Sequence, residues 1–289
     1  MRILVFGRVG QLGSALAELL PSHHVVTFLD QPDVDLARPE TLPDLIGQNE
    51  PELVINAAAY TAVDKAESEP QLAGLINAHA PRVMAKTCQT LGIPLIHYST
   101  DYVFDGTAST PYTEEAPVSP KSVYGRTKLD GEEGVAKETD QHIILRTAWL
   151  YSHIGHNFLK TMLRIASEGK PLRVVDDQMG SPTFAWDLGM ASVAFVDALE
   201  SGRDDVYGIF HATNAGVTSW HGFAQKIFEL AKAEQVDLMA IPTDSYPTPA
   251  PRPAYSVLNG GRLKRVVGVK MPDWQDALTS CQTLERPGD

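Results

Sequence analysis

The chain has 289 residues, of which 43% are hydrophobic and 21% charged, as is typical of a soluble globular protein. Its formal net charge of −12 argues against nucleic acid or an anionic membrane surface as a partner. Cys88 and Cys281 are too few for a disulfide framework, and no apolar stretch is long enough to span a membrane. The start, "MRILVFGRVGQLG", lacks the cleavage site of a signal peptide, so we expect a cytoplasmic protein.

The first half of the chain alternates short apolar runs with longer segments of helical spacing. The apolar runs predict buried strands at Ile3–Phe6, Val25–Leu29, Leu53–Asn56, Leu95–Ser99 and Ile143–Arg146. The longer segments predict helices at Gln11–Leu20, Glu40–Gly47, Leu72–Leu91 and Val123–Lys137. This alternation predicts an α/β fold with a doubly wound parallel sheet of the Rossmann type and right-handed crossovers.

The second half is less regular. Leu172–Val175 reads as a further strand, Asp187–Leu199 and Trp220–Glu234 as helices, and the proline-rich Ser245–Ser256 as irregular chain. We therefore predict a dinucleotide-binding domain over residues 1–150, with a further strand near 172–175. A smaller C-terminal domain over residues 151–289 is expected to bind mainly the substrate.

Three glycines, Gly7, Gly10 and Gly13, directly follow the first predicted strand and open the first predicted helix. In a dinucleotide site the first permits a tight turn, the second a close approach to the pyrophosphate, and the third tight packing of helix on strand. Asp30 ends the second strand, where an acid can bind the ribose hydroxyls of adenosine and so favours NADH. Arg8 can pair with the 2′-phosphate of NADPH instead, so the coenzyme preference stays open. The alternative is a glycine-rich turn without a ligand.

A Tyr-x-x-x-Lys pair, Tyr124 and Lys128, lies in the predicted helix Val123–Lys137 and therefore on one helix face. Such a pair is common by chance and can be an exposed helix pair. Ser99 and Thr100, however, follow the fourth strand at its carboxyl end, where ligands bind in α/β sheets. We therefore expect a hydroxyl, a phenol and an ammonium to converge where a nicotinamide ring would lie.

This combination suits hydride transfer to a ketone. Negative charge grows on the carbonyl oxygen as hydride arrives; Tyr124 can supply the proton and Thr100 a hydrogen bond. The charge of Lys128 is expected to favour the phenolate of Tyr124, and the same ammonium can bind the nicotinamide ribose.

The order of motifs resembles the extended short-chain dehydrogenase/reductase family, and within it the dTDP-4-dehydrorhamnose reductase branch. The matching blocks are "GRVGQLG", "VINAAAYTAVDKAE", "HYSTDYVFDG", "YGRTKLDGE", "LRTAWLY", "NFLKTML", "DDQMGSPT" and "PRPAYSVL". The resemblance implies Thr100, Tyr124 and Lys128 as the catalytic set. It implies cofactor contacts from Gly7, Gln11, Leu12, Asp30, Asp35, Leu36, Ala57, Ala58, Ala59, Tyr102 and Lys128. It implies that Val63, Asp64, Trp149 and Arg252 face the sugar nucleotide.

Two of these assignments also have a physical reason. A guanidinium at Arg252 can pair bidentately with a diphosphate, although a solvated arginine in a connecting loop is the alternative. Small residues at 57–59 let the adenosine side of a cofactor lie close, although ordinary strand-end packing would also explain them. Asn77 fits an asparagine that this superfamily places near its active site, or else a buried polar residue of structural use.

Some positions depart from the branch. Tyr255 stands where asparagine is usual, and Arg8-Val9 replaces Lys-Thr or Lys-Asn. Some relatives are linked to magnesium, but we see no carboxylate cluster with magnesium-like spacing and predict no metal site. His153 and His156 read as loop histidines.

The resemblance implies NADPH- or NADH-dependent reduction of dTDP-6-deoxy-L-lyxo-4-hexulose to dTDP-L-rhamnose, by a possible homodimer. A dehydratase of this family needs Asp-Glu after its threonine, whereas Asp101-Tyr102 follows Thr100 here. A related epimerase remains an alternative. So does a non-catalytic subunit resembling the regulatory beta subunit of methionine adenosyltransferase.

Overall fold

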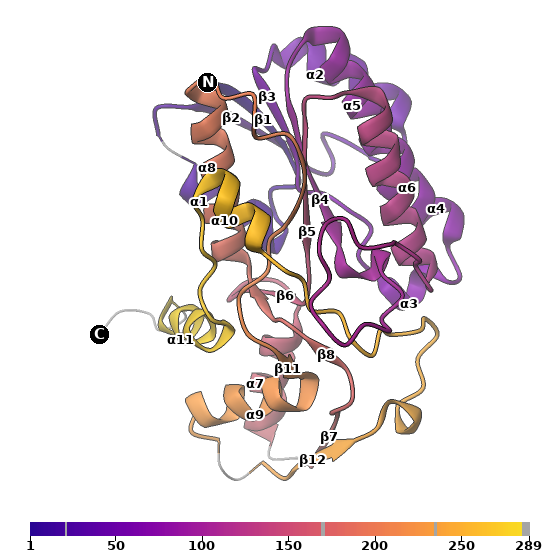
Figure 1. Cartoon of the computed structure of the whole chain (residues 1–289), viewed down its shortest axis with the longest axis vertical. Coiled ribbons are helices and arrows are strands. Elements are labelled where there is room, and N and C mark those ends of the chain that lie inside the picture. Colours follow the sequence, from indigo (N-terminus) through magenta and orange to yellow (C-terminus); the bar gives the residue numbers. More distant parts are fainter. Residues whose placement is uncertain (21, 169–170, 234–235, 285–289) are drawn as a thin grey trace.

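A parallel sheet occupies the upper part of the computed structural model, which describes residues 1–20, 22–168, 171–233 and 236–284 (Figure 1). Its strand order is β10-β5-β4-β3-β1-β2. The strands are β1 (Arg2–Phe6), β2 (Val25–Leu29), β3 (Leu53–Asn56), β4 (Leu95–Thr100), β5 (His142–Thr147) and β10 (Gly208–His211). The five strands predicted from apolar runs are therefore confirmed, and the predicted Rossmann-type doubly wound sheet with them.

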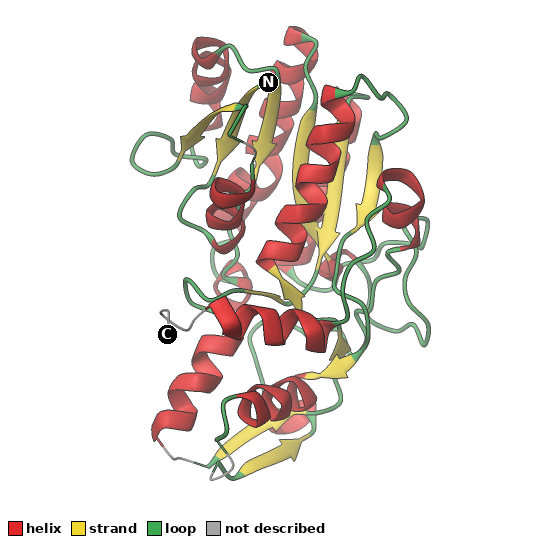
Figure 2. Ribbon diagram, turned by 90° about the vertical axis from the view of Figure 1, so that its left-hand side faces the viewer, coloured by secondary structure: helices red, strands yellow, loops and turns green. Residues whose placement is uncertain are grey.

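Helices cover both faces of this sheet (Figure 2). One face carries α1 (Gln11–Leu19), α8 (Ala185–Glu200) and α10 (Gly261–Val267), and the other carries α2 (Leu42–Asn49), α5 (Ala80–Leu91) and α6 (Val123–Glu138). Because side chains alternate along a strand, β1 serves both layers. Ile3 and Val5 join the apolar cluster of α1 and α8, whereas Leu4 and Phe6 join that of α2 and α5.

The chain reverses its direction of winding at β1. From β1 it moves to the edge strand β2 on one side and, after α2, to β3 on the other. In doubly wound sheets ligands bind beyond the carboxyl ends of the strands at such a switch point. The glycine turn after β1 and the segment after β3 lie at this point.

Residues beyond 150 contribute to two places. The lower part of Figure 1 contains α7 (Phe158–Glu168), α9 (Trp220–Leu230) and β7 (Leu172–Val175), which pairs with β12 (Leu238–Ile241). Phe184, Phe223 and Trp274 belong to the apolar cluster of this lower lobe, and Trp274 begins α11 (Trp274–Leu284). The strand predicted at 172–175 is thus present, but it pairs in this lobe and does not extend the main sheet.

The sixth strand of the main sheet is β10, which pairs with β5. Together with α8 and α10 it returns from the second half of the chain to the sheet. A division into domains at residue 150 therefore stays a proposal, with these three elements assigned to the sheet. Within the described residues, no helix has the length and apolarity needed to cross a bilayer.

The helix predicted over 72–91 is present but interrupted. It consists of α4 (Pro70–Gly74), a π-helical segment η2 (Leu75–His79) and α5. Such single wide turns are frequent at functional sites. Here the turn carries Asn77, which is buried.

Candidate active site

The glycine turn has the local geometry that a dinucleotide requires. Gly7 has φ +93°, and a Cβ there would stand 3.0 Å from the backbone nitrogen of Ala58. A Cβ on Gly13 would stand 1.7 Å from the carbonyl oxygen of Gly7, so helix α1 packs directly on the turn. A Cβ on Gly10 would meet nothing within 4 Å, so this glycine borders open space. The three expected roles of the glycines therefore fit the turn.

Asp30 holds this turn to the end of β2. Its Oδ2 accepts hydrogen bonds from the backbone N–H groups of Arg8, at 2.7 Å, and Val9, at 2.9 Å. Its Oδ1 accepts one from the N–H of Gln31. The carboxylate therefore lies beside the turn, as expected for a residue at the adenosine ribose, and it also orders the turn. The guanidinium of Arg8 lies over the ring of Phe28.

Thr100 is the last residue of β4 and its side chain is 5% exposed. The hydroxyl donates to Asp101 Oδ1 at 2.9 Å and accepts from the N–H of Tyr102 at 3.2 Å, which caps η3 (Asp101–Val103). A hydrogen bond with the Thr100 hydroxyl lowers the pKa of Tyr124, so the hydroxyl and the phenol are neighbours. Tyr124 also packs edge-on against the ring of Tyr102, with centroids 5.5 Å apart.

Lys128 lies one turn beyond Tyr124 on α6, and its ammonium is almost completely buried. Its Nζ donates to the carbonyl oxygen of Tyr98 in β4 at 2.6 Å. Because Tyr98 is two residues before Thr100, this bond fixes α6 against the carboxyl end of β4. The structure thus brings Thr100, Tyr124 and Lys128 together at the edge where the glycine turn also lies.

One electrostatic expectation is wrong. Lys128 was expected to favour the phenolate, but burial raises the pKa of Tyr124 to about 12, with the Thr100 hydroxyl lowering it and Asp101 raising it. Burial lowers the pKa of Lys128 to about 8, against the negative charge of Glu132. Desolvation is the largest cause of both pKa shifts. Tyr124 is therefore a neutral phenol, which is the form that gives up a proton.

The remaining predicted cofactor residues surround the switch point. Leu12 and Leu36 are buried in the apolar clusters of the two sheet faces, and Asp35 accepts a hydrogen bond from the N–H of Ala37. Ala57–Ala59 directly follow β3 and are partly buried. The side chain of Gln11 bonds Asn157 at 2.9 Å, so it joins α1 to the lower lobe. Their contacts with a cofactor stay predictions.

Two predicted substrate residues bind each other. Arg252 Nη2 lies 2.7 Å from Asp64 Oδ2, and Asp64 Oδ1 accepts from the N–H of Ala250. Val63 and Asp64 begin α3 (Val63–Ala66), directly after the segment that follows β3. The contact therefore ties the proline-rich segment to the switch-point side of the sheet. Trp149 follows β5, whose Thr147 is in register with Thr100.

Asn77 has a clear structural use. Its Oδ1 accepts from the N–H of Tyr60 at 2.8 Å, and its Nδ2 donates to the carbonyl of Tyr60 and to the hydroxyl of Thr127. It thereby holds the chain after β3 against α6. Sequence reasoning had left this role and an active-site role open, and the geometry supports the structural one.

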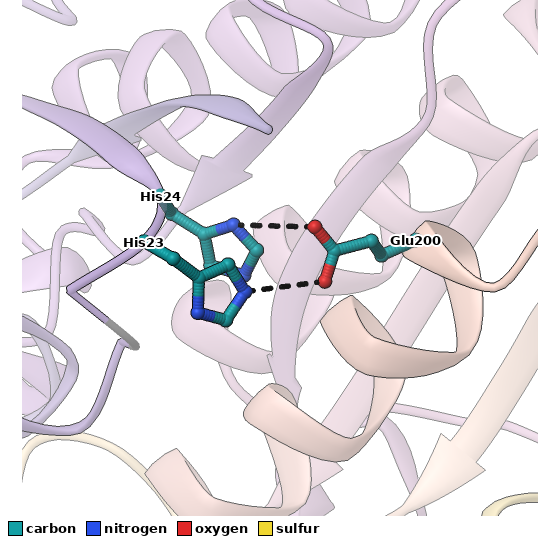
Figure 3. Close-up of side chains that lie close together, drawn as sticks. All are labelled: His23, His24 and Glu200. Carbon is teal, nitrogen blue, oxygen red and sulfur yellow. Dashed lines mark hydrogen bonds and ion pairs between the residues drawn. The ribbon is translucent and has the colours of Figure 1, made fainter.

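A group of possible metal ligands lies at the opposite edge of the sheet. Figure 3 shows His23 and His24, which precede β2, converging on Glu200 at the end of α8. His23 Nε2 lies 3.3 Å and His24 Nδ1 3.7 Å from the carboxylate. Ion pairing and hydrogen bonding account for these contacts. His153 and His156 lie in the loop between β6 (Leu150–Tyr151) and α7.

A Rossmann-type sheet with threonine, tyrosine and lysine at its carboxyl edge defines a dinucleotide-dependent oxidoreductase of the short-chain type. The family model described as the RmlD substrate binding domain matches residues 1–286, and the chain belongs to this family.

Two curated relatives and one solved structure are similar over almost the whole chain. A dTDP-4-dehydrorhamnose reductase of Sinorhizobium fredii is 43% identical, covering 96% of this chain and 95% of the relative. A probable dTDP-4,6-dihydroxy-2-methyloxan-3-one 4-ketoreductase of Streptomyces antibioticus is 41% identical, with 96% and 93% covered. The crystal structure of dTDP-4-dehydrorhamnose reductase from Bacillus anthracis in complex with NADP is 34% identical, has a TM-score of 0.92, and covers 98% of this chain and 99% of that one.

Proposed function

We propose that the protein is a dTDP-4-dehydrorhamnose reductase, which reduces the 4-keto group of dTDP-6-deoxy-L-lyxo-4-hexulose to give dTDP-L-rhamnose. The observation that supports this proposal best is the bond from Lys128 to the carbonyl of Tyr98, which holds α6, the helix of Tyr124, against the strand that ends at Thr100. The similarity to reductases of this name over nearly the full chain supports the substrate.

The reaction needs a hydride at C4 of the sugar and a proton on its oxygen. A reduced nicotinamide dinucleotide supplies the hydride. Tyr124, a neutral phenol with a pKa of about 12, gives its proton to the oxygen as negative charge develops there. The Thr100 hydroxyl holds the same oxygen, provided that its proton turns from Asp101 toward the substrate. Lys128 binds the ribose and keeps the cofactor in place.

Either coenzyme fits the glycine turn. The carboxylate of Asp30 already accepts three backbone N–H bonds, which offset part of its charge, and Arg8 is exposed beside it. Both features favour a 2′-phosphate, so we propose that NADPH is the preferred coenzyme and NADH a weaker one. The ratio of kcat/KM with the two coenzymes measures this preference.

A second 4-keto substrate has support from one observation. A relative of nearly equal similarity is described as acting on a different dTDP-4-keto sugar. The two keto sugars therefore need a direct comparison. The rate of NADPH oxidation is measured with each of them. NADPH oxidation with the other sugar alone would replace the substrate proposed above.

Homodimer formation also stays a proposal, and light scattering of the purified protein measures it.

The decisive experiment combines an NADPH-oxidation assay with Tyr124→Phe. We expect the substitution to lower kcat by roughly 10²–10⁴-fold, because the proton donor is lost, with the NADPH Kd within about twofold of wild type. Tyr207→Phe is the matched control: Tyr207 is a partly buried tyrosine directly before β10, and the variant should keep full activity. A wild-type protein that binds NADPH but never oxidises it, and is indifferent to Tyr124→Phe, would be a non-catalytic subunit.

A further inference from the structure

Trp149 has a backbone conformation that bulky residues rarely adopt. Its φ is +48°, in the left-handed region that favours glycine. The residue lies between β5 and β6, and its carbonyl oxygen accepts from the N–H of Thr183, next to the pairing of β6 with β9 (Thr183–Phe184). An unfavourable conformation of this kind persists only where surrounding contacts hold it, and such residues cluster at ligand sites.

Two residues of the lower lobe hold the indole ring. The ring of Trp220 is stacked on that of Trp149, with centroids 3.6 Å apart and planes inclined by 8°. On Gly180, a Cβ would stand 2.5 Å from Cε2 of Trp149 and 2.8 Å from its Nε1. The indole therefore fits only because residue 180 has no side chain. Phe158 packs against Trp220 in turn, with centroids 4.7 Å apart.

A short antiparallel strand pair, β8 (Met179–Gly180) with β11 (Thr218–Ser219), positions both Gly180 and Trp220. Gly180 in β8 pairs with Thr218 in β11, and Trp220 follows at once. The neighbouring residue of β8, Met179, also bonds the backbone of Ala254 and Ser256, which follow Arg252 closely in the chain. The same strand pair thus connects the indole to the predicted diphosphate ligand.

From these contacts we propose that Trp220 and Gly180 are positioning residues that fix the indole of Trp149 against the sugar of a bound nucleotide sugar. This inference rests on the proposed function, which requires the sugar nucleotide to bind beside Trp149 at the carboxyl edge of the sheet. Neither positioning residue lies in the glycine turn or on α6. They act on the affinity for the keto sugar and leave hydride transfer to Thr100, Tyr124 and Lys128.

The test uses Trp220→Leu and Gly180→Ala in the full-length protein. The first removes the stacked ring, and the second places a methyl group where the indole lies. We expect the KM for the keto sugar nucleotide to rise roughly tenfold in each, the loss expected of one well-placed aromatic contact. The NADPH Kd and kcat should stay within about twofold of wild type. Trp220→Phe, which keeps a flat ring, should recover most of the affinity.

A spectroscopic readout separates positioning from simple destabilisation. Two indoles stacked this closely couple their electronic transitions, so the difference between the circular dichroism of wild type and Trp220→Leu should show a paired positive and negative band. Gly180→Ala should lose the same signal. The control is Trp186→Phe, which removes a partly buried tryptophan of the lower-lobe cluster and should change neither this signal nor KM.

The outcomes distinguish a failure of the positioning role from a failure of the proposed function. If wild type turns over the keto sugar and Trp220→Leu has an unchanged KM, the positioning role is wrong and the proposed function stands. A fall in kcat and thermal stability without a change in KM gives Trp220 a purely structural role and also overturns the inference. If wild type neither turns over the keto sugar nor binds dTDP-L-rhamnose in a calorimeter, the proposed function fails, and the inference with it.

Discussion

Asp64 and Arg252, 188 positions apart in the sequence, form an ion pair in which Asp64 Oδ2 lies 2.7 Å from Arg252 Nη2. Burial alone would raise the pKa of Asp64, but the bonds from Arg252 and from the N–H of Ala250 hold it below its ordinary value. The carboxylate is therefore charged and orients the guanidinium before any substrate arrives. A preoriented arginine loses little freedom when it binds a phosphate.

Arg252→Lys tests this arrangement. Lysine keeps the charge but cannot bind Asp64 and a diphosphate with a planar fork, so the KM for the keto sugar nucleotide should rise roughly tenfold. The NADPH Kd should not change. Arg164→Lys, in an exposed ion pair with Glu168 on α7, is the control. An increase in the NADPH Kd, with the KM for the keto sugar nucleotide unchanged, would show that Arg252 contacts the cofactor and not the sugar nucleotide.

Gly10 and Gly13 make opposite predictions although they lie in one turn. Gly10 has an ordinary φ of −70° and borders open space, so Gly10→Ala should leave thermal stability unchanged and weaken NADPH binding by obstructing the phosphates. Gly13→Ala drives a methyl group into the Gly7 carbonyl and should lower the melting temperature as well. Gly47→Ala, also in open space but on α2, should leave NADPH affinity unchanged. Equal NADPH affinity in wild type and Gly10→Ala would show that the phosphates of NADPH do not bind at this turn.

NADPH binding should weaken as the pH rises through about 8. Burial lowers the pKa of Lys128 to about 8 in the free protein, and only the ammonium can donate to the ribose. Because the bound cofactor favours the charged form, the loss of that proton costs affinity above this pH. Lys128→Met should have a weaker Kd at pH 7 and no such dependence, as measured by fluorescence titration between pH 6.5 and 9.5. A wild-type Kd that is constant over this range would contradict the prediction.

Asp101→Asn should stabilise the fold at neutral pH. Burial raises the pKa of Asp101 to about 6, even though the Thr100 hydroxyl donates to it. In the unfolded chain the Asp101 carboxyl ionises near pH 4, whereas in the folded protein it ionises near pH 6. The difference lowers the free energy of unfolding progressively between pH 4 and 6, and the full loss is present above pH 6. The amide avoids this cost, of the order of 3 kcal/mol at most. Melting temperatures should therefore differ at pH 8 and converge near pH 4; a lower value for Asp101→Asn at pH 8 would contradict this.

The parallel strands β1 to β5 could be predicted because each is a short apolar run between longer helical segments. The sixth strand could not, because Gly208–His211 is short and begins with glycine and its partner β5 lies over 60 positions earlier. Leu172–Val175 shows the complementary limit: its residues indicate a strand, but only the folded chain shows that it pairs with β12.

The predicted catalytic set came from a hydroxyl at a strand end and a Tyr-x-x-x-Lys pair on one helix, whereas its electrostatics could not be predicted. Spacing along α6 indicates that Lys128 is near Tyr124, but not that the ammonium bonds the carbonyl of Tyr98 or that burial dominates both pKa values. Likewise the block "DDQMGSPT" contains Gly180, yet nothing in the sequence shows that an indole rests on it.

The wide turn at Asn77 has a consequence for the rate of the reaction. A Cβ on Gly131 of α6 would stand 2.1 Å from the carbonyl oxygen of Asn77, so the two backbones touch. Tyr124 and Lys128 are carried by the same rigid helix. We expect a single added methyl group at position 131 to displace α6, and with it both Tyr124 and Lys128. We therefore expect the rate of the reaction to depend on the close contact between α6 and the backbone of Asn77.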